Sequence, residues 1–253
     1  AYFLKVPKRI YGCWGLRFET ETGLKRKILI FSDKLIVKYA TKVIYISNSS
    51  FKVCLKNGLV SPNKTVFINK GTSNGIDTNK FNINNVDLKM SEDLKLKYQL
   101  KDKVVIGYAG RITKDKGSYE LVESFETLFS ENNNLRLVLM GHIKCDPAFE
   151  ERFQSHPGII HIPFQDDVPL YMSLFDIFVL PSWREGFPNV PIQAAAMGIP
   201  VVVSNATGCV DAVKEGFNGT IYQVKKGAEL YKALKKYVAD PQLRIEHGNN
   251  GKE

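Results

Sequence analysis

Short apolar runs alternate with amphipathic stretches through the second half of the chain. We expect a strand at each of the apolar runs 104–109, 135–140, 159–162, 177–180, 201–203 and 220–222. Between these runs, apolar residues recur at helical spacing, as Leu121, Val122 and Phe125 do. We expect helices at 118–130, around Glu150, at 168–175, at 189–197, near Val210 and at 228–238. Repeated strand–helix units with short connections predict a parallel, doubly wound α/β sheet.

The first 70 residues show the same alternation over a shorter length. They predict a strand within 9–15, strands at 43–47 and 66–68, and helices at 24–39 and 50–57. The helix at 24–39 is expected to be amphipathic, with basic residues opposite an apolar face. That face would consist of Ile28, Leu29, Phe31, Leu35, Ile36 and Tyr39.

Turn-forming residues separate the two halves of the pattern. Residues 69–77 are rich in Asn, Gly, Ser and Thr, which is typical of a linker, and 81–100 is polar and is expected to connect. We therefore expect two units, 1–80 and 81–253, with a hinge near residues 69–80. A chain of 253 residues is long enough for two modest α/β domains.

Charge distinguishes the two halves more sharply than hydropathy does. Residues 1–70 hold 14 Lys and Arg against 3 Asp and Glu, a net charge of +11. The remaining residues hold 21 against 23, a net charge of −2. This asymmetry indicates an anionic partner or surface for the first part, or a solvated basic face.

Several classes of protein are disfavoured by composition. The four cysteines show no C-x-x-C spacing and the four histidines no ligand spacing, so neither a zinc site nor a disulfide scaffold is indicated. Asp166-Asp167 is not a metal-binding D-x-D motif and is expected to cap a helix. No run of about 18 apolar residues is present, and the start lacks a signal-peptide pattern. We expect reduced thiols, a cytoplasmic location and no metal.

The most informative stretch follows the apolar run 177–180. Glu185 comes just after the carboxyl end of this strand, and a helix N-terminus at Asn189 faces the same place. Open α/β sheets bind ligands there, and helix N-termini favour anions. Because Pro188 and Pro191 lack an N–H, the donors of the turn are those of Gly186, Phe187, Asn189 and Val190. Gln193 lies one helical turn further and can face the same cleft.

A second loop, 110–117, lies between a strand and a helix. Arg111 can make a forked contact to phosphate, and Lys116 offers a point charge near the helix start. Alone, such a loop is typical of a solvent-facing turn. Together with the Glu185 turn, it could enclose a diphosphate, with Glu185 and Gln193 binding hydroxyls on either side. That combination describes a nucleoside diphosphate carrying a sugar.

These motifs resemble the retaining glycosyltransferases of family 4, which have the GT-B fold of two Rossmann-like domains. The resemblance covers 104–250 well, and 9–81 resembles the second half of the acceptor domain, so the N-terminal domain is expected to be incomplete. It is carried by Gly110-Arg111, Lys116-Gly117, Leu180-Pro181-Ser182, Glu185-Gly186-Phe187-Pro188-Asn189-Val190, Gly198-Ile199-Pro200-Val201-Val202 and Asn218-Gly219.

Carried over by position, the resemblance implies roles for individual residues. Arg111 and Lys116, with Gly110 beside them, would hold the donor diphosphate. Glu185 would contact the sugar hydroxyls, with the Gly186–Val190 backbone beside it. Phe164 would lie near the nucleobase, unless it is a core residue. The donor would be a UDP- or GDP-sugar, with no further cofactor.

The chain departs from the family pattern at two positions. Gln193 stands where the family usually has a second Glu that holds the ribose hydroxyls; its amide still bonds but carries no charge. Trp14 stands where the acceptor domain often has a His. The family's glycine-rich first loop and its C-terminal crossing helix have no counterpart. The 253 residues are therefore expected to be part of a longer protein, able to bind donor without turnover.

The sequence thus predicts a retaining glycosyltransferase that acts on a glycan or lipid-linked acceptor in polysaccharide biosynthesis. The alternatives are a GT-B sugar-nucleotide epimerase, for which no acid/base set is evident, and a basic nucleic-acid-binding protein, supported by charge alone. We expect no nucleic-acid partner. An anionic membrane surface is the expected partner of the basic segment. It would hold the protein peripherally on the inner membrane face, mainly through Lys25, Arg26, Lys27, Lys34, Lys38 and Lys42.

Overall fold

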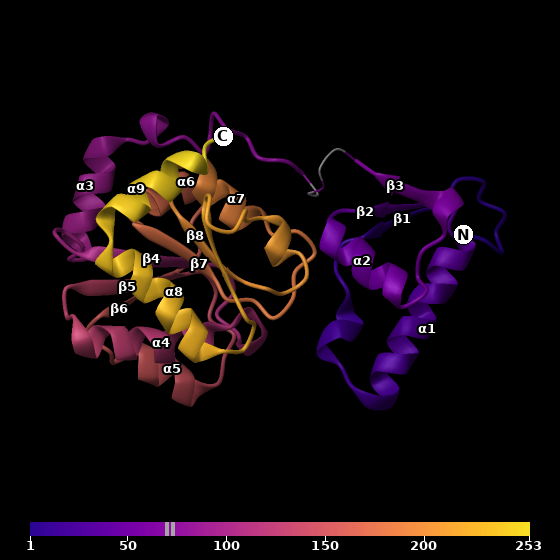
Figure 1. The fold of residues 1–253 in the computed structure, drawn as a ribbon, viewed down its shortest axis with the longest axis horizontal. Coiled ribbons are helices and arrows are strands. Elements are labelled where there is room, and N and C mark those ends of the chain that lie inside the picture. Colours follow the sequence, from indigo (N-terminus) through magenta and orange to yellow (C-terminus); the bar gives the residue numbers. More distant parts are fainter. Residues whose placement is uncertain (69–70, 72–73) are drawn as a thin grey trace. The chain divides into compact units, whose positions relative to one another are not determined.

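The computed structural model describes residues 1–68, 71 and 74–253. Contacts divide the chain into two compact units (Figure 1). The N-terminal unit comprises Ala1–Gly75, Arg184–Pro188 and Ala206–Ala212, and the C-terminal unit comprises Ile76–Trp183, Asn189–Asn205 and Val213–Glu253. The predicted hinge near residues 69–80 falls in part on 69, 70, 72 and 73, which lie outside the described residues. The predicted boundary between 80 and 81 stays a prediction.

Three short parallel strands form the sheet of the N-terminal unit, in the order β1-β2-β3. Their bounds are β1 Ile10–Cys13, β2 Lys42–Tyr45 and β3 Thr65–Phe67. Helix α1 (Gly23–Tyr39) connects the first two strands and α2 (Asn48–Lys56) the last two. Both connections step the same way across the sheet, so right-handed crossovers put both helices on one face. The strands and helices predicted for this region are confirmed within about two residues.

A small core fills the space between this sheet and its helices. Phe18 and Tyr45 are buried in it, and the Tyr45 hydroxyl donates a hydrogen bond to the Leu59 carbonyl at 2.9 Å. The Sγ atoms of the buried Cys13 and Cys54 lie 3.9 Å apart, and both are free thiols. The core therefore combines these aromatic and sulfur-containing side chains with a few aliphatic ones: Leu16, Val37, Ala40, Val43 and Leu59.

The buried face of α1 differs from the predicted apolar face. Val37 is buried, and Leu29 and Ile30 pack partly against the core. Four residues of the predicted face are exposed instead: Ile28 by 57%, Phe31 by 63%, Leu35 by 37% and Ile36 by 41%. Apolar residues surround much of this helix, so its periodicity could not show which side packs. The prediction of one apolar face opposite the basic residues was wrong.

Six parallel strands form the sheet of the C-terminal unit, in the order β6-β5-β4-β7-β8-β9. Their bounds are β4 Val104–Ala109, β5 Leu135–Met140, β6 Ile159–Ile162, β7 Ile177–Leu180, β8 Val201–Ser204 and β9 Gly219–Tyr222. Ala109 pairs with Met140, and Met140 with Ile162, so the carboxyl ends of β4, β5 and β6 are level. The apolar runs mark these strands because helices cover both sides of such a sheet. All six predicted strands are confirmed.

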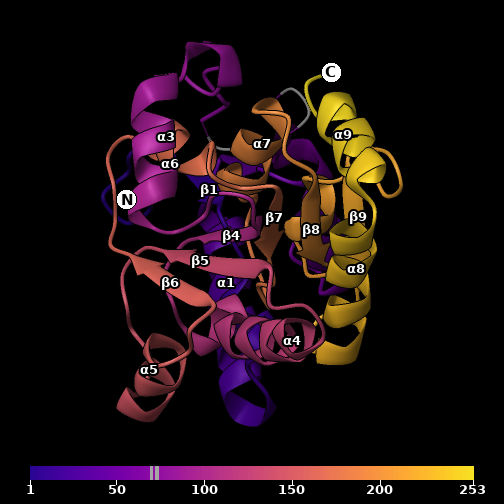
Figure 2. The same ribbon diagram turned by 90° about the vertical axis from the view of Figure 1, so that its left-hand side faces the viewer.

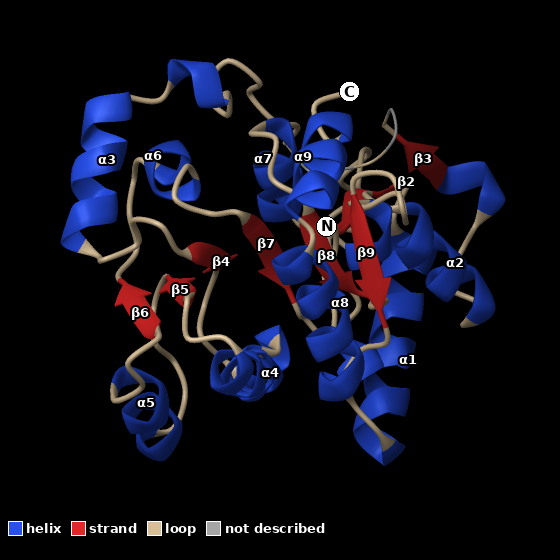
Figure 3. Ribbon diagram, turned by 60° about the vertical axis from the view of Figure 1, so that its left-hand side comes forward, coloured by secondary structure: helices blue, strands red, loops and turns tan. Residues whose placement is uncertain are grey.

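Helices cover both faces of this sheet. Their bounds are α3 Leu88–Lys97, α4 Ser118–Glu131, α5 Pro147–Gln154, α6 Val168–Met172, α7 Asn189–Ala196, α8 Gly227–Ala239 and α9 Pro241–Asn250. Helices α4 and α5 lie on one face, and α3, α6 and α7 on the other (Figures 2 and 3). The helix predicted near Val210 is only a three-residue 3-10 helix, Cys209–Asp211.

An aspartate cap followed by a proline marks the start of three of these helices. Asp146, Asp167 and Asp240 each accept a hydrogen bond from a backbone N–H in the first turn of α5, α6 and α9. A proline stands in the first turn of each helix, where its missing N–H has no cost. The capping role predicted for the Asp166-Asp167 pair is confirmed for Asp167.

The sequence pattern did not predict two of the helices, α3 and α9. Helix α3 lies within 81–100, which was expected only to connect, and its one buried residue is Ser91, whose hydroxyl lies 2.8 Å from that of Ser173. Helix α9 is held by polar contacts as well, because the Tyr237 hydroxyl lies 2.8 Å from Nδ1 of His247. Burial lowers the pKa of His247. Neither helix has the regular apolar face that the pattern detects.

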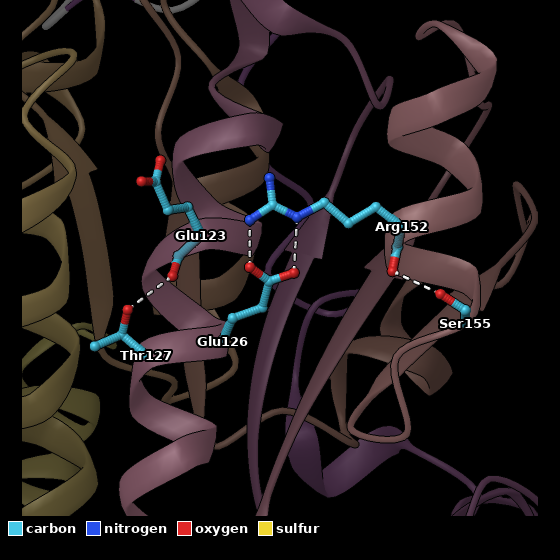
Figure 4. Close-up of polar contacts among 5 residues, drawn as sticks. All are labelled: Glu123, Glu126, Thr127, Arg152 and Ser155. Carbon is cyan, nitrogen blue, oxygen red and sulfur yellow. Dashed lines mark hydrogen bonds and ion pairs between the residues drawn. The ribbon is translucent and has the colours of Figure 1, made fainter.

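An ion pair joins α4 and α5 at the surface. Two guanidinium nitrogens of Arg152 donate to the two carboxylate oxygens of Glu126, in a fork (Figure 4). Tyr119 and Phe149, from the same two helices, also stack, with ring centroids 3.7 Å apart. A partly exposed pair of this kind contributes up to about 1 kcal/mol. The contacts hold α5 against α4 and so anchor the far end of the loop that follows β5.

Candidate functional site

The C-terminal unit has a cavity of about 320 Å³ at the carboxyl ends of β4, β5 and β6. Ligand cavities commonly have a volume of about 300–1,000 Å³. The first turn of α6 and the start of α7 complete the walls. The lining residues are Ala109, Gly110, Arg111, Met140, Gly141, His142, Phe164, Gln165, Val168, Val190 and Gln193.

The strand order explains why the cavity forms here. From β4 the chain proceeds outward to β5 and β6, whereas from β7 it proceeds the other way to β8 and β9. Helices α4 and α7 therefore leave neighbouring strands toward opposite faces of the sheet (Figure 2). A crevice opens outside the carboxyl ends of strands at such a switch point.

The loop after β4 is held in place by hydrogen bonds that its backbone makes with Tyr108 and with the loop after β5. The Tyr108 hydroxyl donates to the Arg111 carbonyl at 2.6 Å. The Ile112 N–H donates to the His142 carbonyl at 2.9 Å, and the Lys144 N–H to the Ile112 carbonyl at 3.1 Å. These bonds fix the Arg111 backbone, while its exposed side chain lines the cavity. A cation is thus positioned at the edge of a mostly apolar cavity.

Lys116 ends a 3-10 helix, Lys114–Lys116, immediately before α4. Gly117 has a φ of +73°, and a Cβ there would lie 2.1 Å from the carbonyl oxygen of Pro181. The Trp183 N–H donates to the Asp115 carbonyl at 2.9 Å. The loop that carries Lys116 is therefore pressed against the chain leaving β7. Only glycine allows this approach, because it has neither a Cβ nor a penalty for positive φ.

Two aromatic rings form a flat part of the cavity wall. His142 and Phe164 stack with ring centroids 5.5 Å apart and an angle of 11° between their planes. Both are exposed and both line the cavity. Sequence reasoning missed His142, because it considered histidines only as metal ligands. Its position could have indicated a place in the site, because Gly141-His142 directly follows an apolar strand and so lies at the carboxyl end of the sheet.

Gly141 also shapes this wall. Its φ is +138°, and a Cβ there would lie 2.1 Å from the carbonyl oxygen of Gly110. The first residues after β4 and β5 therefore touch through their backbones. This contact brings the Arg111 loop and the His142 ring to the same cavity.

The structure brings together five of the predicted site residues at this cavity: Gly110, Arg111, Phe164, Val190 and Gln193. Asn189 is the first residue of α7. Glu185, Gly186, Phe187 and Pro188 belong to the N-terminal unit, where the Glu185 N–H donates to the Thr207 carbonyl at 2.9 Å. The roles assigned to all of these residues stay predictions.

Among the residues that the structure describes, no group of three or more His, Cys, Asp or Glu side chains is placed to hold a metal ion. No described helix is both long and apolar enough to span a membrane. The expectation that no cofactor is needed stays a prediction.

Known proteins resemble the chain over most of its length. The family model for glycosyl transferases group 1 matches residues 91–253. The whole chain aligns at 34% identity with the capsular polysaccharide biosynthesis glycosyltransferase CapM of Staphylococcus aureus and covers 67% of that protein. It is 28% identical to the N,N'-diacetylbacillosaminyl-diphospho-undecaprenol alpha-1,3-N-acetylgalactosaminyltransferase of Campylobacter jejuni, over 99% of this chain and 66% of that protein.

A solved structure shares the fold. The crystal structure of Anabaena Alr3699/HepE in complex with UDP superposes with a TM-score of 0.79 at 20% identity, over 99% of this chain and 68% of that one. The predicted α/β fold of GT-B type is confirmed. The chain spans about two thirds of the length of these relatives.

The close approach of Gly117 to Pro181 yields a stability prediction. Gly117→Ala should lower the free energy of unfolding of the C-terminal unit by more than about 2 kcal/mol, since strain at positive φ adds to displacement of the Pro181 carbonyl. Gly216→Ala is the matched control, because Gly216 has a φ of +69° and nothing within 4 Å of a Cβ. It should cost about 1 kcal/mol.

Both variants would be unfolded in urea in a Trp14→Phe background, so that Trp183 reports on the C-terminal unit. Equal losses in the two variants would show that the Gly117 backbone does not depend on its contact with Pro181.

Proposed function

The chain belongs to the glycosyl transferases group 1, and from this premise we propose that it moves a sugar from a nucleoside-diphosphate sugar to a glycan or lipid-linked acceptor, with retention of configuration. The observation that carries the proposal is the cavity at the switch point between β4 and β7, with Arg111 at its edge. The matched relatives, which are glycosyltransferases, support this class of reaction.

The donor diphosphate is proposed to bind at the loop 110–117. Arg111 offers parallel N–H donors for two phosphate oxygens, and Lys116 adds a second positive charge. The first N–H groups of α4, which begins at Ser118, lack partners within the helix and favour an anion. The anchored backbone of this loop supports the proposal, because only the side chains of Arg111 and Lys116 then lose conformational entropy on binding.

The nucleobase is proposed to occupy the apolar part of the cavity. The stacked rings of His142 and Phe164 offer a flat aromatic surface of the kind on which bases stack. Gln165, which also lines the cavity, has an amide that can bond to a base edge. Uracil and guanine both fit this description, so the donor is proposed to be a UDP- or GDP-sugar.

The sugar and ribose contacts are proposed from the family resemblance. Glu185 would accept hydrogen bonds from the sugar hydroxyls, with the backbone N–H groups of Gly186 and Phe187 beside it. Gln193 would bond to the ribose hydroxyls, and its position on the cavity wall supports this role. Val190 would close the cavity from the start of α7.

The proposed chemistry breaks the bond between the anomeric carbon and the diphosphate oxygen and forms a bond from that carbon to an acceptor hydroxyl. Negative charge develops on the departing diphosphate, and the acceptor hydroxyl gives its proton to the oxygen of that diphosphate from which the anomeric carbon departs. Arg111, Lys116 and the N-terminus of α4 would stabilise this charge, which is usually the largest single catalytic contribution. No step requires a metal or a further cofactor.

The acceptor is proposed to be carried by a membrane lipid. One matched relative is named for a diphospho-undecaprenol-linked acceptor and another for capsular polysaccharide biosynthesis. We accordingly propose a cytoplasmic enzyme that is held peripherally on the inner membrane face through its basic N-terminal segment, and that has no nucleic-acid partner. We therefore expect that a labelled oligonucleotide does not bind detectably to the chain at physiological salt.

The diphosphate site predicts the effect of removing each cation. Arg111→Ala and Lys116→Ala should each weaken binding of the cognate nucleoside diphosphate by roughly 1.5–3 kcal/mol, the cost of a lost charge-assisted contact. Lys103→Ala is the control. Lys103 precedes β4 and so lies at the amino ends of the strands, away from the cavity, and its removal should leave the affinity for the nucleoside diphosphate unchanged. Isothermal titration calorimetry would measure all three. Unchanged affinity in both loop variants rules out this site.

The proposed role of Glu185 separates turnover from nucleotide affinity. Glu185→Gln should lower the turnover of the full-length enzyme at least about 100-fold while changing affinity for the bare nucleoside diphosphate less than about twofold, because that product lacks the sugar. Steady-state kinetics and calorimetry provide the two values. An equal loss in both would assign Glu185 to the nucleotide instead.

A further inference from the structure

The backbone at Glu185 rests on a segment that is distant in the sequence. Residues 206–212, the support segment, belong to the N-terminal unit together with residues 184–188. The Glu185 N–H donates to the Thr207 carbonyl at 2.9 Å. Gly208 has a φ of +81°, and a Cβ there would lie 2.7 Å from the carbonyl oxygen of Glu185. The position of the Glu185 backbone therefore depends on the position of the support segment.

Glu19 holds Thr207 through its side chain. Its Oε1 accepts a hydrogen bond from the Thr207 hydroxyl at 2.6 Å, and its Oε2 is buried as well. Glu19 lies in a 3-10 helix, Arg17–Thr20, whose Phe18 is buried in the core of the N-terminal unit. The core therefore fixes the backbone that carries this carboxylate. One bond to the side chain of Thr207 and one to its carbonyl thus connect Glu19 with Glu185.

A second anchor ties the support segment to helix α2. The Gly208 N–H donates to the Ser49 hydroxyl oxygen at 2.7 Å, and that hydroxyl donates to the Asp211 carboxylate. The Ser49 N–H also donates to the Asp211 carboxylate, at 3.2 Å. Because Ser49 is the second residue of α2, this carboxylate lies at the positive end of a helix. This anchor holds the backbone of the support segment, whereas Glu19 holds the side chain of Thr207.

We propose that Glu19 is a positioning residue for the sugar transfer and acts on Glu185 through Thr207. The inference rests on the role proposed above for Glu185, which is to bind the hydroxyls of the donor sugar. Catalysis is sensitive to the placement of such a group, since a displacement of about 1 Å can lower the rate about 100-fold. Glu19 does not touch the substrate in this account. It limits the movement of the backbone from which the Glu185 side chain extends.

Thr207 provides a matched pair of variants. Thr207→Val has nearly the same shape but no hydroxyl, so it removes the bond to Glu19 and keeps the backbone bond to Glu185. Thr207→Ser keeps the hydroxyl. In the full-length enzyme, Glu19→Ala and Thr207→Val should each lower kcat about tenfold, and Thr207→Ser less than about twofold. The double variant Glu19→Ala, Thr207→Val should lose no more than either single variant, because both remove the same bond.

Nucleotide affinity distinguishes positioning of Glu185 from a general loss of structure. Calorimetry with UDP and GDP should show affinity within about twofold of the unchanged enzyme in every variant, because these products lack the sugar that Glu185 binds. Glu21→Ala is the control. It removes an acid two residues from Glu19, one that pairs with Lys25 at 2.7 Å, and should leave kcat unchanged. Release of UDP or GDP from the sugar nucleotide measures turnover.

A combination of variants tests whether Glu19 acts through Glu185. In a Glu185→Ala background the carboxylate that needs positioning is gone. Glu19→Ala should then lower the remaining turnover less than about twofold, although it lowers that of the unchanged enzyme about tenfold. A further tenfold loss in this background would show that Glu19 acts independently of Glu185 and would overturn the inference.

The outcomes separate this inference from the role proposed for Glu185. Unchanged turnover in Glu185→Ala overturns that role and the inference with it. If Glu185→Ala lowers turnover whereas Glu19→Ala and Thr207→Val do not, only the inference fails. Equal losses of turnover and nucleotide affinity in Glu19→Ala would show a structural role and also overturn it. If Glu19→Ala does not fold, the comparison of Thr207→Val with Thr207→Ser decides the question alone.

Discussion

The reversal of strand order between β4 and β7 is the constraint on which the candidate site depends. Because right-handed connections leave these neighbouring strands toward opposite faces, no helix can cover their carboxyl ends. The cavity, the anchored loop at Arg111 and the start of α7 all follow from this reversal. Two glycines, Gly117 and Gly141, then allow backbone contacts that draw the surrounding loops close. The position of the cavity is thus determined by the order in which the strands are connected, and the side chains then determine what the cavity can bind.

Much of this architecture could be predicted, because the C-terminal sheet is buried on both faces. Its strands therefore appear as continuous apolar runs, and all six were found. The strand–loop–helix order also placed Arg111, Val190 and Gln193 at one edge of a sheet, where they line one cavity. The polar helices α3 and α9 were missed, since capping and buried hydroxyl contacts stabilise them without an apolar period. His142 was missed because its role is defined by the ring that it stacks on.

Helix α1 shows a second limit of sequence patterns. A hydrophobic period identifies an apolar face, but it cannot distinguish a face that packs in the core from one that binds elsewhere. In α1, Val37 is buried in the core and Phe31 is exposed, although both belong to the same run of apolar residues.

The central claim is that a nucleoside diphosphate binds in the cavity at the strand-order reversal. Hydrogen–deuterium exchange of the chain, with and without saturating UDP or GDP, tests it most directly. The account predicts that one of the two nucleotides slows exchange of backbone amides in 110–118, 141–144, 164–168 and 189–193, and leaves α1 and α5 unchanged. Binding that protects only amides outside these segments, or no binding of either nucleotide, would contradict it.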